Sequence, residues 1–294
     1  MSRPLALLLF ACLLLPAMVG TAVAGTRIVA SIYPLAMVSM AVAKADTEVK
    51  VIVPTGASTH DYQLTPGDIE AINGADIVVW AGPEAEPYLA SILDAGKANA
   101  RPTEQRVITL STLPGVVLRD YRLDPVDTKK HGRDPHLWLS TRNAALLAQA
   151  LGARLGNALA AEHFTAEMQR YRSRQAKRFA PVARMPLLVA HDAYGYLLDE
   201  IGLTNTSALV TEPDIAASAR RIIDLAQRVK REHIGCMIGE EGFQNGVAPR
   251  LFEGTSANLV VLDPQLGGIT LTRDSYTLSL THFADTLYGC LVTR

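Results

Sequence analysis

The run at residues 141–179 most constrains the fold, because it separates two stretches that each alternate strands with helices. Apolar residues recur in it at helical spacing, and no proline interrupts it. The first apolar stripe is Ala144, Leu147, Leu151, Leu155 and Leu159, and a second one is Phe164, Met168 and Tyr171. Ser140 or Thr141 can cap its start. Glycines make a break plausible near 156–164, so the run is one long helix or two in series.

Short apolar, β-branched segments on both sides of this run predict strands. They lie at 26–32, 48–53, 76–80 and 106–110 before the run, and at 187–190, 205–210, 235–238 and 258–263 after it. Helical patterns between them favour parallel sheets covered on both faces. We therefore expect an α/β protein with two lobes, each a roughly four-stranded, mostly parallel sheet flanked by helices, joined by a long backbone helix. The expected divisions are an N-terminal lobe at 25–139, a linking helical segment at 140–182 and a C-terminal lobe at 183–294.

The N-terminus has the pattern of an export signal. Arg3 precedes an apolar run, and Ala22 and Ala24 fit a small-residue cleavage site. We expect residues 1–24 to be removed and the mature chain to begin at Gly25 in the periplasm. The alternative is a membrane anchor, but the run is short for a membrane span and contains Pro16.

Charge and cysteine content narrow the class further. Without Arg3 the chain has 27 basic residues against 29 acidic ones, so its bulk charge does not favour nucleic-acid binding. Cleavage also removes one of three cysteines and leaves Cys236 and Cys290. An even pair in an exported chain is most simply a disulfide, and two buried free thiols are the alternative.

Three of the seven histidines stand beside the predicted elements at places suited to a ligand site. His60 follows the second strand, His136 precedes the central run, and His191 ends the first strand of the second lobe, while Asp263 ends the last strand. Ligands of open α/β sheets bind beyond the carboxyl ends of the strands, so these four residues can face one crevice. Three imidazoles and a carboxylate suit tetrahedral Zn2+. Their long separations in sequence are in themselves unspecific.

Four motifs, taken in order, give the chain a resemblance to the periplasmic zinc- and manganese-binding proteins of bacterial ABC importers. They are GASTHDYQLTPGD at 56–68, DPHLWLS at 134–140, VAHDAYGY at 189–196 and VLDPQLGGI at 261–269. The resemblance covers essentially the whole mature chain. It implies two lobes bridged by a long helix, with one metal ion between them held by His60, His136, His191 and Asp263. Cys236 and Cys290 match the disulfide of the zinc-specific members.

The same resemblance bears on the metal and on the partners. Manganese members have a glutamate where this chain has His191, and imidazole in place of a hard carboxylate favours zinc. The implied function is zinc capture, as a monomer, and delivery of Zn2+ to an ABC permease in the inner membrane, without catalysis. A periplasmic zinc chaperone is a further candidate partner. The loop at 120–135 contains only His131, with Asp120, Asp124, Asp127 and Asp134, too little for a strong second zinc reservoir.

Several other residues are weaker candidates. Asp61 and Asp192 each follow a proposed ligand and could orient its ring, with turn capping as the alternative. Glu240 and Glu241 could support the ligands from a second shell. Glu84 and Glu86 are expected to be solvated carboxylates at a helix start. We expect Trp80 and Trp138 to pack near the cleft, and His163, His233 and His282 not to be ligands.

Three other functions stay open on the sequence. A manganese-binding homologue would share the fold. A periplasmic zinc hydrolase would need an open coordination position and a base such as Glu240 or Glu241, and no HExxH motif is present. A metal-linked adhesin or metallochaperone partner could use the same fold, since fold does not decide function.

Overall fold

The first lobe contains a four-stranded parallel sheet. In this computed structural model, residues 25–95, 103–121, 132–210, 217–241, 246 and 248–293 are described. The strands β1 Arg27–Ala30, β2 Glu48–Val51, β3 Ile77–Trp80 and β4 Val107–Thr109 lie in the order β2-β1-β3-β4. Its helices are α1 Tyr33–Val42, α2 Pro66–Gly74, α3 Pro87–Ala95 and the short α4 Thr103–Arg106. Thr65 and Asp68 form a capping box at the start of α2, where Pro66 needs no N–H partner.

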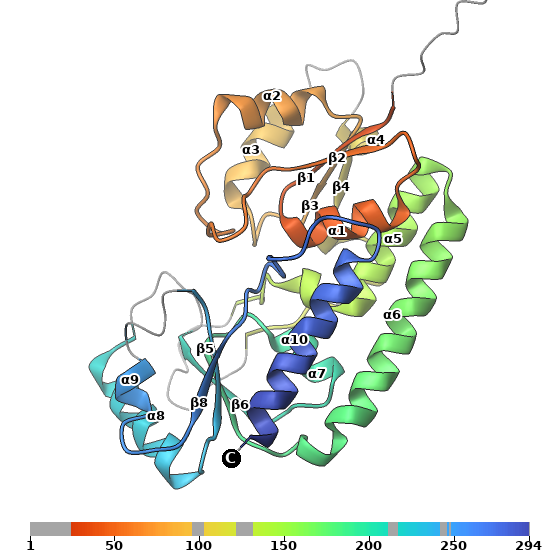
Figure 1. The fold of residues 1–294 in the computed structure, drawn as a ribbon. Coiled ribbons are helices and arrows are strands. Elements are labelled where there is room, and N and C mark those ends of the chain that lie inside the picture. Colours follow the sequence, from red (N-terminus) through yellow and green to blue (C-terminus); the bar gives the residue numbers. More distant parts are fainter. Residues whose placement is uncertain are drawn as a thin grey trace, which may run out of the picture.

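The second lobe repeats this topology (Figure 1). The strands β5 Leu187–His191, β6 Thr206–Val210, β7 Cys236–Gly239 and β8 Asn258–Val261 lie in the order β6-β5-β7-β8, all parallel. Its helices are α7 Gly195–Glu200, α8 Ala219–Arg231, α9 Ala248–Leu251 and α10 Ser275–Val292. Every residue of β3, β5 and β7 is buried, as expected of parallel strands covered on both faces. The predicted fold class is confirmed.

The central run forms two antiparallel helices, α5 Thr141–Leu155 and α6 Ala158–Phe179. Gly156 ends α5 in the left-handed region at φ 61°, which glycine adopts at low cost. This turn corrects one expectation, because it removes Leu159 from the predicted stripe. Leu155 is buried while Leu159 is 78% exposed. The second stripe, from Phe164 to Tyr171, is buried as predicted.

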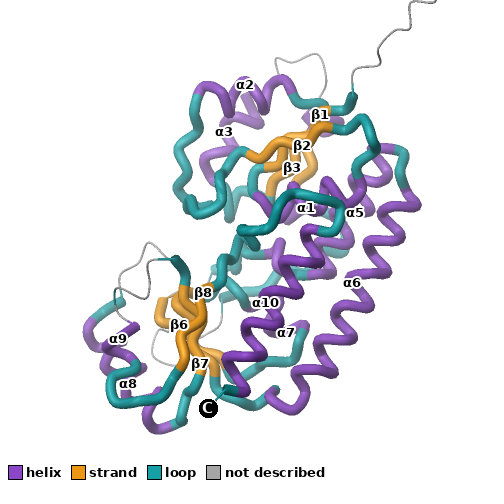
Figure 2. Tube along the Cα trace, viewed as in Figure 1, coloured by secondary structure: helices purple, strands orange, loops and turns teal. Residues whose placement is uncertain are grey.

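Helices α6 and α10 connect the two halves of the molecule. Figures 1 and 2 show one sheet in each lobe, α6 running alongside both lobes, and α10 lying between α6 and the second sheet. The N-terminal lobe meets α10 through α1. Short 3-10 turns occupy Leu110–Thr112, Leu137–Leu139 and Ala180–Val182. Within the described residues, no helix is both long and apolar enough to cross a membrane.

A disulfide joins Cys236 of β7 to Cys290 of α10, and this bond confirms the predicted pairing. Both cysteines are buried, and they fasten the C-terminal helix to the second sheet. The expected signal segment at 1–24 lies outside the described residues, as do His131, Asp124 and Asp127 of the polar loop.

Candidate metal centre

All four residues predicted as ligands line one cavity of about 780 Å³. His60 lies in the loop after β2, His136 directly precedes the 3-10 turn Leu137–Leu139, His191 is the last residue of β5, and Asp263 follows β8. The cavity walls come from both lobes, because residues 55–60 belong to the first sheet's loops and residues 261–268 to the second's. Segments that follow strands of both sheets therefore meet at one cavity, beyond the carboxyl ends of the strands, where open α/β sheets bind ligands.

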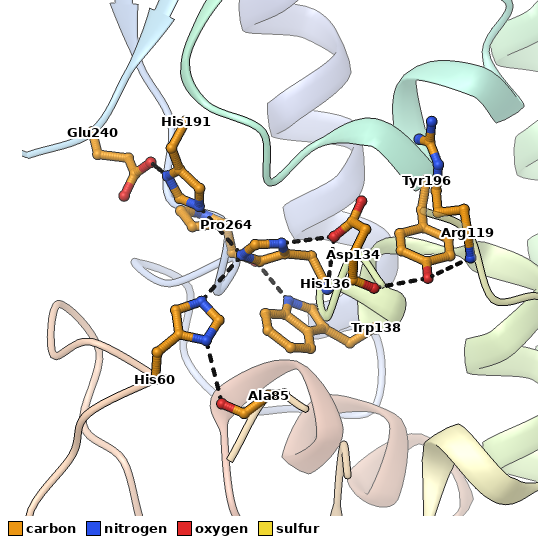
Figure 3. Close-up of polar contacts among 10 residues, drawn as sticks. All are labelled: His60, Ala85, Arg119, Asp134, His136, Trp138, His191, Tyr196, Glu240 and Pro264. Carbon is orange, nitrogen blue, oxygen red and sulfur yellow. Dashed lines mark hydrogen bonds and ion pairs between the residues drawn. The ribbon is translucent and has the colours of Figure 1, made fainter. Parts of the chain in front are cut away.

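The three imidazoles point their Nε2 atoms at one another (Figure 3). The Nε2 atom of His136 lies 3.3 Å from that of His60 and 3.2 Å from that of His191. Two nitrogens bound to a tetrahedral zinc ion at ~2.05 Å would lie ~3.3 Å apart, so these spacings match a zinc shell. Among the described residues, no group of three or more His, Cys, Asp or Glu side chains is already arranged closely enough to hold a metal ion.

On each ring the other nitrogen, Nδ1, has a polar partner, and this contact directs Nε2 into the cavity. Asp134 Oδ1 lies 2.8 Å from Nδ1 of His136, and Glu240 Oε1 contacts Nδ1 of His191. Nδ1 of His60 lies 3.3 Å from the carbonyl oxygen of Ala85. Such partners fix the tautomer of a metal-binding histidine and raise its basicity.

These partners differ in part from the predicted ones. Asp61 is exposed, whereas Asp134 faces the ring of His136 and Glu240 that of His191. The orienting roles expected of Asp61 and Asp192 stay predictions. Glu240 was a candidate for this role from its place after a strand. Asp134 stands two residues before His136, a spacing that lets its carboxylate also accept the backbone N–H of His136 at 3.0 Å. That spacing is the signal that sequence reasoning missed.

The carboxylate of Asp263 is held by its own turn. Its Oδ1 accepts the backbone N–H of Gln265 at 2.7 Å, and its Oδ2 accepts that of Gly267 at 3.1 Å. A side chain at Gly267 would come within 2.5 Å of Oδ2, so the close approach requires glycine. Burial raises the pKa of Asp263, which the two backbone hydrogen bonds partly counteract. Each oxygen keeps a lone pair for a further ligand.

His136 lies deepest of the three histidines. Its side chain is almost fully buried, and burial, followed by the neighbouring rings of His191 and His60, lowers its pKa well below the usual value. The imidazole is therefore neutral at physiological pH, the form that binds a metal ion.

Glu86 is not the solvated helix-start carboxylate that the sequence predicted, whereas Glu84 is exposed as expected. Glu86 is fully buried, and one oxygen accepts the backbone N–H of Ala81 at 2.6 Å. Burial raises its pKa to about 7, against the lowering effect of its hydrogen bonds. It lies next to Ala85, whose carbonyl faces His60.

The remaining candidates divide into cavity and surface residues. His163 and His233 are exposed and do not line the cavity, whereas His282, on α10, does. Glu241 is an exposed residue of the cavity wall. Trp138 packs its ring edge-on against His136, with ring centroids 5.3 Å apart.

Known proteins resemble this chain in sequence and in fold. The sequence model of the family described as zinc-uptake complex component A, periplasmic, matches residues 28–290. A high-affinity zinc uptake system protein of Yersinia pestis is 29% identical over 298 residues, which cover 91% of this chain and 92% of the relative. A similar protein of Haemophilus ducreyi is 27% identical over 308 residues, with 94% and 96% covered.

Solved structures match the whole two-lobed arrangement. A periplasmic zinc-binding protein of Treponema pallidum superposes with a TM-score of 0.74 at 20% identity, covering 92% of this chain and all of that one. A laminin-binding protein of Streptococcus agalactiae, described as having adhesin and metal transporting activity, has a TM-score of 0.73 at 21% identity, with 91% and 100% covered. These likenesses show the fold.

Proposed function

Because this chain belongs to the family of periplasmic component A proteins of zinc-uptake complexes, we propose that it captures Zn2+ in the periplasm and delivers it to an ABC permease of the inner membrane. The single observation that supports this most directly is the spacing of the three Nε2 atoms, which fits one zinc ion. Zinc is here the cargo, and no covalent bond is made or broken.

The proposed ligands are His60, His136, His191 and Asp263. A shell of three imidazoles and one carboxylate favours zinc over manganese, which prefers oxygen ligands. A full shell also leaves no position for a reactive water, so it favours binding over hydrolysis. Glu240, one of the two candidates for the base of a hydrolase, already contacts His191.

Zinc content of the purified mature protein tests this proposal. We expect about one Zn2+ per chain for the wild type, and strong loss of zinc in His191→Ala, since removing a ligand breaks the shell. His163→Ala is the matched control, because His163 is exposed on α6 and outside the cavity wall. Equal zinc content in all three proteins, or turnover of esters or peptides by the zinc-loaded protein, would contradict the proposal.

Delivery and location need their own tests. Zinc uptake by cells that lack the chain should recover with the wild type and fail to recover with His191→Ala. The N-terminal sequence of the secreted protein should begin at Gly25. The molecular mass of the protein in solution tests whether it is a monomer, as expected. The same measurement with a candidate zinc chaperone added tests whether the two proteins bind each other.

A further inference from the structure

Three hydrogen bonds join the chain segments that contain three of the four proposed ligands. Each runs from a buried aromatic side chain to a backbone carbonyl oxygen. They are Tyr196 Oη to Asp134 O at 3.0 Å, Tyr194 Oη to Leu262 O at 2.7 Å, and Trp138 Nε1 to Pro264 O at 2.9 Å. We call these three contacts the hydrogen-bond circuit.

The bonded residues lie immediately beside the ligands. Asp134 and Trp138 each stand two positions from His136, and Leu262 and Pro264 flank Asp263. Tyr194 and Tyr196 follow His191 by three and five positions. Segment 191–196 therefore contacts segment 134–138, segment 134–138 contacts 262–264, and 262–264 contacts 191–196 again. The three segments form a closed circuit.

Burial makes these contacts strong constraints. Tyr194, Trp138 and Tyr196 are 0%, 1% and 3% exposed. Water cannot replace a lost partner at such positions, so breaking one bond leaves a buried carbonyl oxygen unsatisfied. The hydroxyl of Tyr196 also accepts the backbone N–H of Arg119 at 3.1 Å (Figure 3). This second bond holds the phenol in place from its other side.

His60 reaches the cavity from the other lobe. Its loop meets the second lobe through Gln265, whose side-chain amide donates to the carbonyl oxygen of Ala57. The metal centre thus combines three ligands from one bonded circuit with one ligand from a loop of the first sheet.

We propose that Tyr194, Tyr196 and Trp138 are positioning residues that hold His136, His191 and Asp263 as one preformed unit, which His60 completes from the first lobe. This inference rests on the proposed zinc-binding function. Ligands that are already in place lose little conformational freedom when the ion binds. The hydrogen-bond circuit therefore raises zinc affinity without contacting the metal.

Conservative substitutions can test the unit through zinc affinity, measured by competition with a chromophoric chelator. Tyr196→Phe and Tyr194→Phe each remove one hydroxyl, and we expect zinc affinity to fall by about 10–100-fold, the range typical of lost outer-shell partners. Tyr171→Phe is the matched control, because Tyr171 is equally buried and its hydroxyl also donates to a backbone carbonyl, that of Leu280, while neither residue is part of the cavity wall.

A double-mutant cycle separates positioning from general destabilisation. Tyr196→Phe should weaken zinc binding by the same factor in a His60→Ala background, where the unit is intact. It should have little further effect in a His136→Ala background, where the ligand it positions is gone. Denaturant unfolding of each metal-free protein checks that the variants fold.

The outcomes distinguish this inference from the function on which it rests. Affinity unchanged in both tyrosine variants, equal loss in Tyr171→Phe, or the same factor in all backgrounds would overturn the preformed unit while leaving zinc capture standing. A wild-type protein that binds no zinc would overturn both.

Discussion

His136 and Asp134 are bonded twice, because one carboxylate oxygen of Asp134 faces both Nδ1 of His136 at 2.8 Å and the backbone N–H of His136 at 3.0 Å. Both residues are buried, so water does not weaken the contact. The carboxylate accepts hydrogen bonds only, so the proton of a neutral ring must sit on Nδ1. Nε2 is then free of a proton and directed at the cavity.

Asp134→Asn should therefore lower zinc affinity by about 10–100-fold. The amide keeps the size of the side chain but removes its charge and can place a donor against Nδ1. Chelator competition measures the affinity, and nitrogen NMR of the ring reports its tautomer. Asp76→Asn is the control, since Asp76 also accepts a backbone N–H, from Arg27 at 2.9 Å, outside the cavity wall. An unchanged tautomer with unchanged affinity would contradict the role of Asp134.

Acid should release zinc, and His136 should contribute to this release only at strongly acidic pH. Its pKa lies well below the ordinary imidazole value of ~6.5, since burial and the two neighbouring rings oppose its charge. Protons thus compete for His136 only well below that pH. Titration of zinc affinity from about pH 8 down to about pH 4 measures the effect. An affinity that stays constant over this whole range would contradict coordination by histidine.

In the metal-free protein, Glu86→Gln should become more stable relative to the wild type as the pH rises from acidic to alkaline values. Burial raises the pKa of Glu86 in the folded protein to about 7, against an ordinary value of 4.5. A raised carboxyl pKa contributes stability below the unfolded value, and this contribution is lost as pH rises through the folded value. As the pH rises through this range, the wild type thus loses about 3 kcal/mol of unfolding free energy, and the variant with a neutral glutamine does not.

Denaturant unfolding at about pH 4.5 and about pH 8 provides the measurement for Glu86. The exposed neighbour Glu84 offers the control Glu84→Gln, which should follow the wild type at both pH values. If Glu86→Gln and the wild type showed the same pH dependence, Glu86 would not be a buried carboxylate with a raised pKa.

Gly195→Ala should destabilise the protein by about 1–3 kcal/mol, as overpacking of a filled site does. A Cβ at this position would come within 2.0 Å of Nη1 of Arg119. Gly235→Ala meets no atom within 4 Å and is the control. Thermal or denaturant unfolding gives the comparison, and equal stability of the two variants would show that Arg119 moves aside freely.

Loss of the disulfide should cost about 4 kcal/mol of unfolding free energy, from loop-closure entropy over the 54 residues that separate the cysteines. The double variant Cys236→Ser, Cys290→Ser should unfold at lower denaturant concentration than the wild type. Added reductant should move the wild type toward the variant and leave the variant unchanged. A wild type insensitive to reductant after unfolding and refolding would contradict this estimate of the bond's contribution.

The regular elements could be predicted from sequence because their signals are local. Alternating strands and helices, a proline at the start of α2 and apolar spacing in α6 each concern neighbouring residues. The resemblance to zinc-binding proteins of ABC importers rested on motifs, and the family match confirms it. Leu159 was assigned wrongly because the left-handed turn at Gly156 shifts the helical register.

Other features depend on distant contacts and could not be predicted. Burial of Glu86 follows from the loop after β3 folding back on Ala81, which composition does not reveal. The contact between Glu240 and His191 joins the ends of two neighbouring strands, β7 and β5. Predicting it therefore requires knowing the order of the strands in the second sheet. The roles of His60, His136, His191 and Asp263 as zinc ligands stay predictions, and the oxygens of Asp263 also accept the backbone N–H groups of Gln265 and Gly267.

The bond between Cys236 and Cys290 also bears on how the protein matures. The chain between these sulfurs includes Asp263, so oxidation encloses that residue in a covalent loop. Before oxidation, the two thiolates are themselves soft donors of the kind that bind zinc and other soft metal ions. Oxidation removes these thiolates as alternative metal donors while it fastens the C-terminal helix to the second sheet.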